Sequence, residues 1–169
     1  MLTISTRHLT EKDWISVLKI YADGIATGLA TFETEVPSWE QWHEKYIQSC
    51  RIVAISNENV VGFAVLSRVS NREVYKGVAE VSVYVDHSFR GQHIGETLLR
   101  QLIKESEAHQ FWTLQAGIFS SNIASIALHE KCGFRVIGVR EKIGQRHGVW
   151  FNNHLLERRS KSVMNEQNK

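Results

Sequence analysis

EVSVYVDHSFRGQHIGETLL, residues 80–99, is the stretch that decides the fold of this chain. Alternating β-forming residues from Val81 to Val85 predict a strand over residues 78–85. The segment from Arg90 to Gly95 then leads into apolar positions at helical spacing, which predict an amphipathic helix over residues 91–109. A strand, a glycine-containing loop and a helix N-terminus together favour an anion site, because the N–H groups of the first turn are unpaired and the helix dipole is positive there.

The loop between this strand and this helix lacks two common phosphate-binding motifs. It has no Gly-Lys-Ser/Thr ending, as in nucleotide triphosphatases, and no GxGxxG followed by an acidic residue about twenty positions later. Its sequence, Arg90-Gly91-Gln92-His93-Ile94-Gly95, resembles the pyrophosphate loop of the GNAT N-acetyltransferases, whose signature is Gln/Arg-x-x-Gly-x-Gly/Ala. Arg90 and Gly95 match this signature, whereas His93 occupies the place of its first glycine. Taken alone, the loop fits a simple helix cap equally well.

Length and composition restrict the class of protein. The 169 residues, 43% of them hydrophobic, suit one domain, predicted over residues 1–157 and followed by a polar tail over residues 158–169. A net charge of +2 gives no broad field for nucleic acid, and no apolar run is long enough for a signal core or a membrane span. Cys50 and Cys132 are isolated, which favours reduced thiols in a cytoplasmic protein. We expect no metal, no nucleic-acid partner and no membrane partner.

The order of the remaining predicted elements fits a mixed α/β sheet with helices on both faces. Helices are expected after the capping residues Thr10 and Ser38, and over residues 91–109 and 124–131. A polar turn at residues 57–59 predicts an antiparallel hairpin between its two neighbouring strands. The strands are predicted over residues 2–8, 51–56, 60–67, 78–85, 113–118, 134–139 and 149–156.

A second motif, NIASIALHEKCGF, runs from Asn122 to Phe134. It resembles the other half of the GNAT cofactor site, in which the asparagine fixes the pantetheine arm, although Asn122 alone is also a good helix cap. Because both motifs occur about thirty residues apart with a strand between them, the chain is identified as a member of the GNAT family. The resemblance implies the acyl-CoA N-acyltransferase fold, an α/β fold with a central, mixed, mostly antiparallel sheet flanked by helices, and acetyl-CoA as co-substrate. It assigns to acetyl-CoA the residues Val83, Tyr84, Val85, Arg90, Gly91, Gln92, His93, Ile94, Gly95, Glu96 and Asn122.

Three further segments resemble one branch of this family, the phosphinothricin and methionine sulfoximine/sulfone N-acetyltransferases. They are TFETE at residues 31–35, VAEVSVYV at residues 78–85 and IGQRHGVW at residues 143–150. The resemblance implies a homodimeric enzyme that acetylates the amino group of a small amino-acid-like substrate by direct transfer from acetyl-CoA.

Acetyl transfer to an amine needs a neutral nitrogen, a polarised thioester carbonyl and protonation of the leaving thiolate. Such amines are mostly protonated at pH 7, so a positioned base contributes roughly 10²- to 10⁴-fold to the rate. Glu80 is the candidate base, directly or through water, since the matched family position has that role; the alternative is a solvated carboxylate at a strand edge. The resemblance implies that backbone N–H groups from Val83 to Val85 hold the pantetheine and polarise the carbonyl.

Histidines are candidates for two further roles. His129 stands where many family members carry a tyrosine, and its imidazole is a candidate acid for the leaving thiolate. A packing role for His129 remains open, because a thiolate leaves without much help. We expect His93 to contact phosphate through its backbone, whereas His147 either lines the acceptor pocket or lies on the surface.

The acceptor site departs from the pattern of the branch. An arginine that suits a substrate carboxylate usually stands about ten residues before the base, and Ser70 occupies that place here. Arg68, Arg72 and Lys76 are the candidates to replace its charge, although none is in register. The residues expected to bind substrate are Phe32, Arg72, Glu73, Val74, Tyr75 and Glu80.

Two other readings of the sequence remain. The same fold can acetylate a protein, a peptide or a polyamine, and an open, acidic groove would favour this reading over a closed aromatic pocket. A non-catalytic sensor of acetyl-CoA is the other reading, and the presence of Glu80 and Asn122 argues against it.

Overall fold

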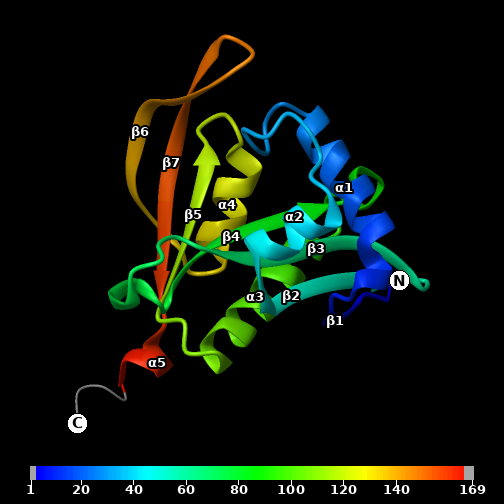
Figure 1. Ribbon diagram of the computed structural model, residues 1–169, viewed down its shortest axis with the longest axis horizontal. Helices are drawn as coiled ribbons and strands as arrows, with labels where there is room; N and C mark the ends of the chain where they lie inside the picture. The colour runs from blue at the N-terminus through cyan, green and yellow to red at the C-terminus, as the bar shows by residue number, and fades with distance from the viewer. Residues whose placement is uncertain (1–2, 166–169) are drawn as a thin grey trace.

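One sheet organises the computed structural model, which describes residues 3–165, and its strand order is β1-β2-β3-β4-β5-β7-β6 (Figure 1). The strands are β1 (Ser5–His8), β2 (Tyr46–Ser56), β3 (Asn59–Arg68), β4 (Val78–Val85), β5 (Thr113–Phe119), β6 (Arg135–Arg146) and β7 (Val149–Arg159). The α-helices are α1 (Trp14–Ala26), α2 (Trp39–Lys45), α3 (Ile94–Ala108), α4 (Ile123–Lys131) and α5 (Lys161–Asn165). Short 3-10 turns are η1 (Glu11–Asp13), η2 (Glu73–Tyr75) and η3 (His87–Phe89).

The pairing of β4 with β5 is the only parallel pairing among these strands, which confirms the predicted mixed, mostly antiparallel sheet. It extends over three residue pairs and ends at Glu80, which lies opposite Gln115. β4 continues to Val85 beside β3 alone. The sheet therefore divides beyond Glu80, and Figure 1 shows β4 and β5 diverging with α4 beside the opening.

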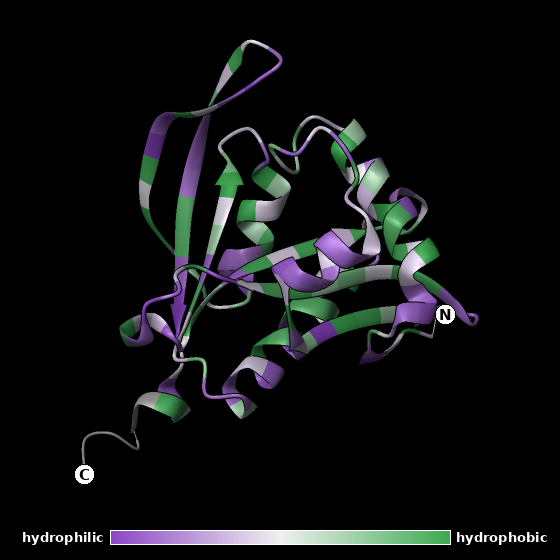
Figure 2. Ribbon diagram, in the orientation of Figure 1, coloured by the Kyte–Doolittle hydropathy of each residue, from purple (hydrophilic) through white to green (hydrophobic). Residues whose placement is uncertain are grey.

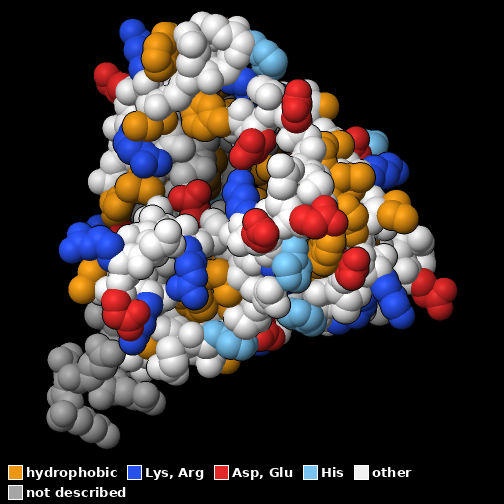
Figure 3. Space-filling model, in the orientation of Figure 1, with side chains coloured by type: hydrophobic (Ala, Val, Ile, Leu, Met, Phe, Trp, Pro, Cys, Tyr) orange, Lys and Arg blue, Asp and Glu red, His pale blue; other side chains and the backbone are white. Residues whose placement is uncertain are grey.

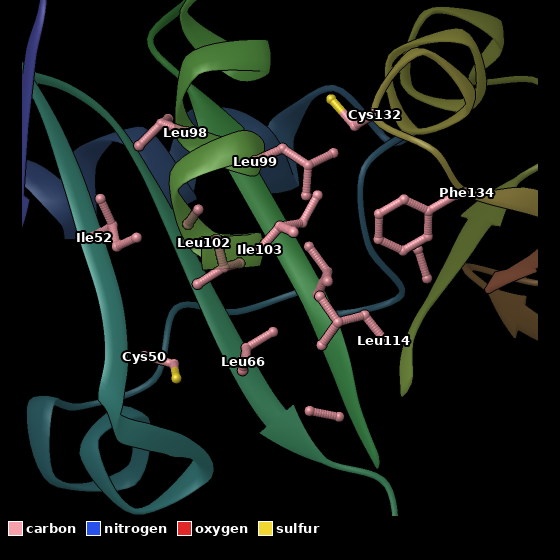
Figure 4. Close-up of a cluster of buried hydrophobic side chains, with 14 of the residues drawn as sticks. Cys50, Ile52, Leu66, Leu98, Leu99, Leu102, Ile103, Leu114, Cys132 and Phe134 are labelled. Carbon is pink, nitrogen blue, oxygen red and sulfur yellow. The ribbon is translucent and has the colours of Figure 1, made fainter. Parts of the chain in front are cut away.

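Alternate residues of the central strands face opposite sides of the sheet, and helices cover both sides. On one face, the apolar stripe of α3 packs on side chains from β2, β3 and β5 (Figure 4). On the other face, α1 and α2 pack on Val53, Phe63 and Val65. Trp42 is completely buried there and contacts the ring of Trp14, with ring centroids 5.4 Å apart. β3 and β4 therefore contribute side chains to both cores at the centre of the molecule.

The helix predicted over residues 91–109 is shorter in the structure, where α3 begins at Ile94. His93 is its N-cap and has a φ of 60°, and Gly91 has a φ of +75°. This left-handed backbone is incompatible with a helix, so the loop turns sharply before α3 starts. The turn leaves the N–H groups of the first helical turn at the surface of the molecule.

The two ends of the chain differ in part from the expectation. β1 begins at Ser5, and Leu2, where this strand was predicted to start, lies outside the described residues. At the other end, β7 continues to Arg159, beyond the predicted limit of the domain at residue 157. α5 follows, and Ser160 and Val163 are buried, so this part of the predicted polar tail packs against the rest of the molecule. In the part of the chain that the structure describes, no helix has the length and apolar character needed to cross a membrane.

Candidate active site

Glu80 lies at the point where the sheet divides. Its backbone pairs with both neighbouring strands, and its side chain is half-buried. The Nε2 of Gln115 donates a hydrogen bond of 3.0 Å to Oε2 of Glu80, which orients the carboxylate. Because the other carboxylate oxygen remains available at the opening of the sheet, Glu80 is placed to accept a proton from a bound molecule.

A cavity of about 330 Å³ opens beside Glu80. We call it the acceptor cavity, and in Figure 3 the face shown is hollowed near its centre, with acidic and basic side chains at the rim. Its walls come from α1, the 29–33 loop, α2, all strands from β2 to β7, and α4. The described residues that carry chemistry in it are Tyr21, Glu33, Lys45, Tyr46, Glu80, Tyr84, His129, Arg140 and Asn153.

One wall of the acceptor cavity is aromatic. Phe32 meets Phe119 edge to face at a centroid distance of 4.5 Å, and Phe151 stacks on Phe119 at 4.7 Å. The β6–β7 hairpin approaches this cluster closely, because a Cβ atom at Gly144 would lie only 2.6 Å from the Phe32 ring. Phe32 therefore lines the same cavity as Glu80 of its own chain, and its contact with substrate stays a prediction.

A second cavity, the cofactor groove, has a volume of about 550 Å³ and runs between α3 and α4. All the residues that the sequence assigned to acetyl-CoA line this groove except Gln92, which is exposed. Gly24, Thr27, Phe89, Leu128 and Lys131 also line it and were missed. Several residues line both cavities, and they are Leu29, Ala30, Val83, Tyr84, Asn122 and Ser125. The two cavities therefore meet at the free edge of β4.

The entrance to α3 has the features of an anion site. The first-turn N–H groups have no partner within the helix, and Arg90 and Lys131 add positive charge to the groove. Among the described residues that line the groove, Glu96 is the one acidic residue, and the side chains of Lys131 and Arg100 lower its pKa to about 2. Glu96 is thus fully ionised and held by two cations, so the groove retains a positive balance that suits a phosphate group.

Asn122 has the geometry of a helix cap. Its Oδ1 accepts a hydrogen bond from the backbone N–H of Ser125 at 3.2 Å, and its Nδ2 donates to the carbonyl oxygen of Leu29 at 3.3 Å. The capping interpretation of Asn122 is therefore confirmed. Since the same residue lines both cavities, its contact with pantetheine stays a prediction.

His129 is buried, with only 4% of its surface exposed, and lines the acceptor cavity. The carbonyl oxygen of Ser125 lies 2.7 Å from Nδ1 and can only accept, so Nδ1 carries the proton. Burial lowers the pKa of His129 below its ordinary value, more than the hydrogen bond to Ser125 raises it. His129 is therefore neutral at pH 7, with Nε2 as an acceptor, and this state does not favour the role of proton donor to a thiolate.

The segment with the other predicted substrate residues lies away from both cavities. Arg72, Glu73, Val74 and Tyr75 surround the η2 turn, and none of them is among the described residues that line the acceptor cavity. Val74 and Tyr75 are exposed by 64% and 44%. The guanidinium of Arg72 lies over the Tyr75 ring, and Lys76 forms an ion pair of 2.7 Å with Glu73.

Arg140 and Asn153 are two of the polar cavity residues that the sequence did not reveal. They face each other across β6 and β7, and Nη2 of Arg140 donates to Oδ1 of Asn153 at 3.0 Å. His147, at the tip of this hairpin, is exposed and is not among the described residues that line the cavity. Within residues 3–165, no three His, Cys, Asp or Glu side chains lie close enough to hold a metal ion.

A positively charged groove meets a carboxylate-bearing cavity at the free edge of β4, an arrangement that suits transfer of a group between a phosphate-bearing donor and an acceptor. The chain belongs to the acetyltransferase (GNAT) family, whose model matches residues 14–134, and it is an N-acetyltransferase. It is 30% identical to phosphinothricin N-acetyltransferase of Alcaligenes faecalis, over 91% of this chain and 81% of that protein. It is 27% identical to the L-methionine sulfoximine/L-methionine sulfone acetyltransferase of Pseudomonas aeruginosa, over 89% of this chain and 91% of that protein. The predicted family and branch are confirmed.

Two solved structures are similar over almost the whole chain. The phosphinothricin acetyltransferase from Sinorhizobium meliloti in complex with acetyl-CoA has a TM-score of 0.84 and 30% identity, covering 93% of this chain and 88% of that one. The ribosomal-protein-alanine N-acetyltransferase from Brucella melitensis has a TM-score of 0.85 and 34% identity, covering 92% of this chain and 99% of that one. These similarities confirm the predicted fold.

Replacing His93 with glycine, the residue of the family signature, tests whether the loop before α3 binds its ligand through the backbone alone. His93 has a left-handed backbone, its side chain is 77% exposed, and it makes no capping hydrogen bond. Glycine removes a backbone penalty of about 1–2 kcal/mol, although the greater freedom of the unfolded chain offsets part of this gain. We expect His93→Gly to keep or slightly raise the melting temperature and to leave CoA affinity unchanged in calorimetry. A tenfold loss of affinity would show that the imidazole itself contacts the ligand.

The lowered pKa of His129 makes stability depend on pH. Its pKa is lower in the folded than in the unfolded chain, so protonation favours unfolding. The stability that neutral His129 contributes is complete above the unfolded pKa of about 6.5 and is lost as the pH falls through the folded pKa. We therefore expect His129→Gln to reduce the difference in free energy of unfolding between pH 7.5 and 5.5, measured with urea. His147→Gln, on the exposed hairpin, should show the same difference in free energy of unfolding between the two pH values as the wild-type protein. If both variants show the same difference, His129 is not a source of the pH dependence.

Proposed function

We propose that this protein transfers the acetyl group of acetyl-CoA directly to the amino group of a small amino-acid-like substrate. The observation that carries the proposal is the junction of the cofactor groove with the acceptor cavity at β4, the strand that also carries Glu80. The names of the relatives point to the same chemistry, since phosphinothricin, methionine sulfoximine and methionine sulfone are amino-acid analogues.

The cofactor groove fits acetyl-CoA by its own chemistry. The first turn of α3, Arg90 and Lys131 provide donors and positive charge for phosphates, and apolar residues such as Leu128 and Val85 line the rest. Acetyl-CoA would supply the acetyl group as a thioester. The backbone of β4 beyond Glu80 pairs with β3 alone, so its free edge is available to bind the pantetheine and polarise a carbonyl.

Glu80 would act as the general base. It would accept a proton from the substrate ammonium, directly or through water, so that the neutral nitrogen forms the new C–N bond. As the C–S bond breaks, the nitrogen would lose its second proton and the departing thiolate would take up a proton to give free CoA. Gln115 holds the carboxylate in place during this step. Since His129 is neutral, its Nε2 is suited to accept a hydrogen bond from the amine substrate. The CoA thiolate would leave without a proton from His129.

A protein or peptide N-terminus is the rival acceptor, and the name of the Brucella structure supports it. Two features of the acceptor cavity favour the small molecule. The cavity is bounded by the Phe32–Phe119 wall, and its charged residues are of both signs, Glu33 and Glu80 with Lys45 and Arg140. A groove for a protein N-terminus or a polyamine would instead be open and acidic.

An acetylation screen tests this proposal. The acceptors are methionine sulfone, methionine sulfoximine, phosphinothricin, spermidine and a peptide with N-terminal alanine, each assayed by release of free CoA. We expect the amino-acid analogues to have the highest kcat/KM. A higher value for the peptide or for spermidine would replace the proposed substrate class, and CoA binding without any turnover would indicate a sensor.

The proposal includes a homodimer that acts in the cytoplasm. β6 lies at the end of the sheet, and the β6–β7 hairpin exposes apolar side chains between polar ones (Figure 2). They are Val136, Ile137, Val139, Ile143, Val149 and Trp150, exposed by 37% to 58%. Such an edge supports pairing with a second copy. Analytical ultracentrifugation of the protein would measure its oligomeric state. The buried free thiols of Cys50 and Cys132 support a location in a reducing compartment such as the cytoplasm.

A further inference from the structure

Two charged side chains of the acceptor cavity have no counter-charge among the described residues. Glu80 is hydrogen-bonded to the neutral side chain of Gln115, and Arg140 to the neutral side chain of Asn153. The other charged pair in the cavity, Lys45 and Glu33, neutralises itself through an ion pair of 3.2 Å. The cavity therefore presents one free carboxylate and one free guanidinium to whatever molecule it binds.

A missing side chain on β5 gives Arg140 access to the cavity. Asn153, which is 94% buried, lies between Arg140 and β5. A Cβ atom at Gly117 would lie 3.0 Å from Nδ2 of Asn153 and 3.3 Å from Nη2 of Arg140. The guanidinium thus lies above the backbone of β5, in space that any other residue at position 117 would fill. Apart from Asn153, its N–H groups donate to no side chain or carbonyl within residues 3–165.

The two free charges are spaced along one face of β5. Gln115 and Gly117 lie two positions apart on the same face of the strand, which corresponds to roughly 7 Å. The Glu80 carboxylate is hydrogen-bonded to Gln115, and the Arg140 guanidinium lies over Gly117. A molecule with an amine near Glu80 and an anionic group one carbon away can contact both side chains, with a hydrogen bond at each end.

We propose that Arg140 binds the carboxylate of the acceptor and thereby restricts the substrate to α-amino acids and their analogues. The inference rests on the proposed function and adds to it a specificity-determining residue. Arg68, Arg72 and Lys76, which the sequence suggested for this role, do not line the acceptor cavity. Among the described residues, Arg140 is the one arginine that lines the cavity, and a planar guanidinium matches a carboxylate with two parallel hydrogen bonds.

The test compares an acid with its ester. Methionine sulfone and its methyl ester share the amine and the side chain, but only the acid carries the carboxylate. Arg140→Gln removes the charge and keeps an amide to hydrogen-bond Asn153. Arg135→Gln is the matched control, because Arg135 lies on the same strand, pairs with Glu157 and does not line the cavity. Arg140→Lys tests whether charge alone suffices.

We expect Arg140→Gln to lower kcat/KM for the acid by roughly 10- to 150-fold, the range for the loss of a hydrogen bond to a charged group. The loss should appear mainly as a higher KM for the acid. For the ester, Arg140→Gln should have the same kcat/KM as the wild-type protein. Arg140→Lys should lose less kcat/KM for the acid than Arg140→Gln does. Arg135→Gln should leave kcat/KM unchanged for both the acid and the ester. Equal losses for acid and ester, or no loss for the acid, would overturn the inference and leave the proposed function intact. A wild-type protein that acetylates neither compound would contradict the proposed function.

Discussion

Replacing Glu80 with glutamine lowers kcat for amine acetylation at pH 7 by about 100-fold or more, within the range of roughly 10²- to 10⁴-fold for general bases. Glutamine has the same shape and can still accept the hydrogen bond from Gln115, so the variant should fold normally and bind CoA with wild-type affinity. It cannot take a proton from the substrate ammonium. Steady-state kinetics and calorimetry measure the two quantities separately.

The pH dependence separates a base from a residue that only binds the ammonium. As the pH rises toward the pKa of the substrate amine, more substrate arrives neutral, so the ratio of wild-type to Glu80→Gln kcat should shrink. A carboxylate that only binds would act mainly through KM, with an unchanged kcat. Glu73→Gln is the control, since the structure places this exposed residue outside the acceptor cavity. A Glu80→Gln variant with nearly wild-type kcat at pH 7 would assign the proton transfer to an ordered water.

The parts of the site that the sequence predicted are those that local structure determines. Glu80, the loop from Arg90 to Gly95 and the start of α3 follow one another along the chain, so a strand, a turn and a helix suffice to bring them together. Asn122 begins α4 directly after β5, and its capping role is equally local. The polar turn between β2 and β3 and the apolar stripe of α3 indicated the hairpin and the helix that covers the sheet for the same reason.

The residues that the sequence missed reach the site through long-range pairing. Arg140 enters the acceptor cavity because β6 pairs with β7, β7 pairs with β5, and Gly117 leaves space for its guanidinium. None of these conditions is visible in the residues around position 140. The segment from Arg72 to Tyr75 shows the opposite case, since its residue types suit a substrate but the η2 turn lies away from the cavity. Residue types alone do not indicate which way a short polar connection faces.

Replacing Gly95 with tryptophan should lower the affinity for CoA by about 100-fold or more. Gly95 lies in the first turn of α3 on the wall of the cofactor groove, and a Cβ atom there would lie 3.1 Å from Cδ2 of Leu128 on α4. An indole must therefore extend into the groove beside the N–H groups that would bind phosphate. The loss of two charged hydrogen bonds, at about 1.5–3 kcal/mol each, corresponds to 100-fold or more.

Gln92→Trp is the matched control for this substitution. Gln92 belongs to the same loop but is exposed and is not among the described residues that line the groove, so an equally large side chain there should leave affinity for CoA unchanged. Gly95→Ala adds only the methyl group at 3.1 Å from Leu128, which a small movement of that flexible side chain accommodates, and should lose less than tenfold. Melting temperatures of the free proteins show whether Gly95→Trp remains folded. If the folded Gly95→Trp variant binds CoA as tightly as the Gln92→Trp variant, the cofactor does not occupy the groove between α3 and α4.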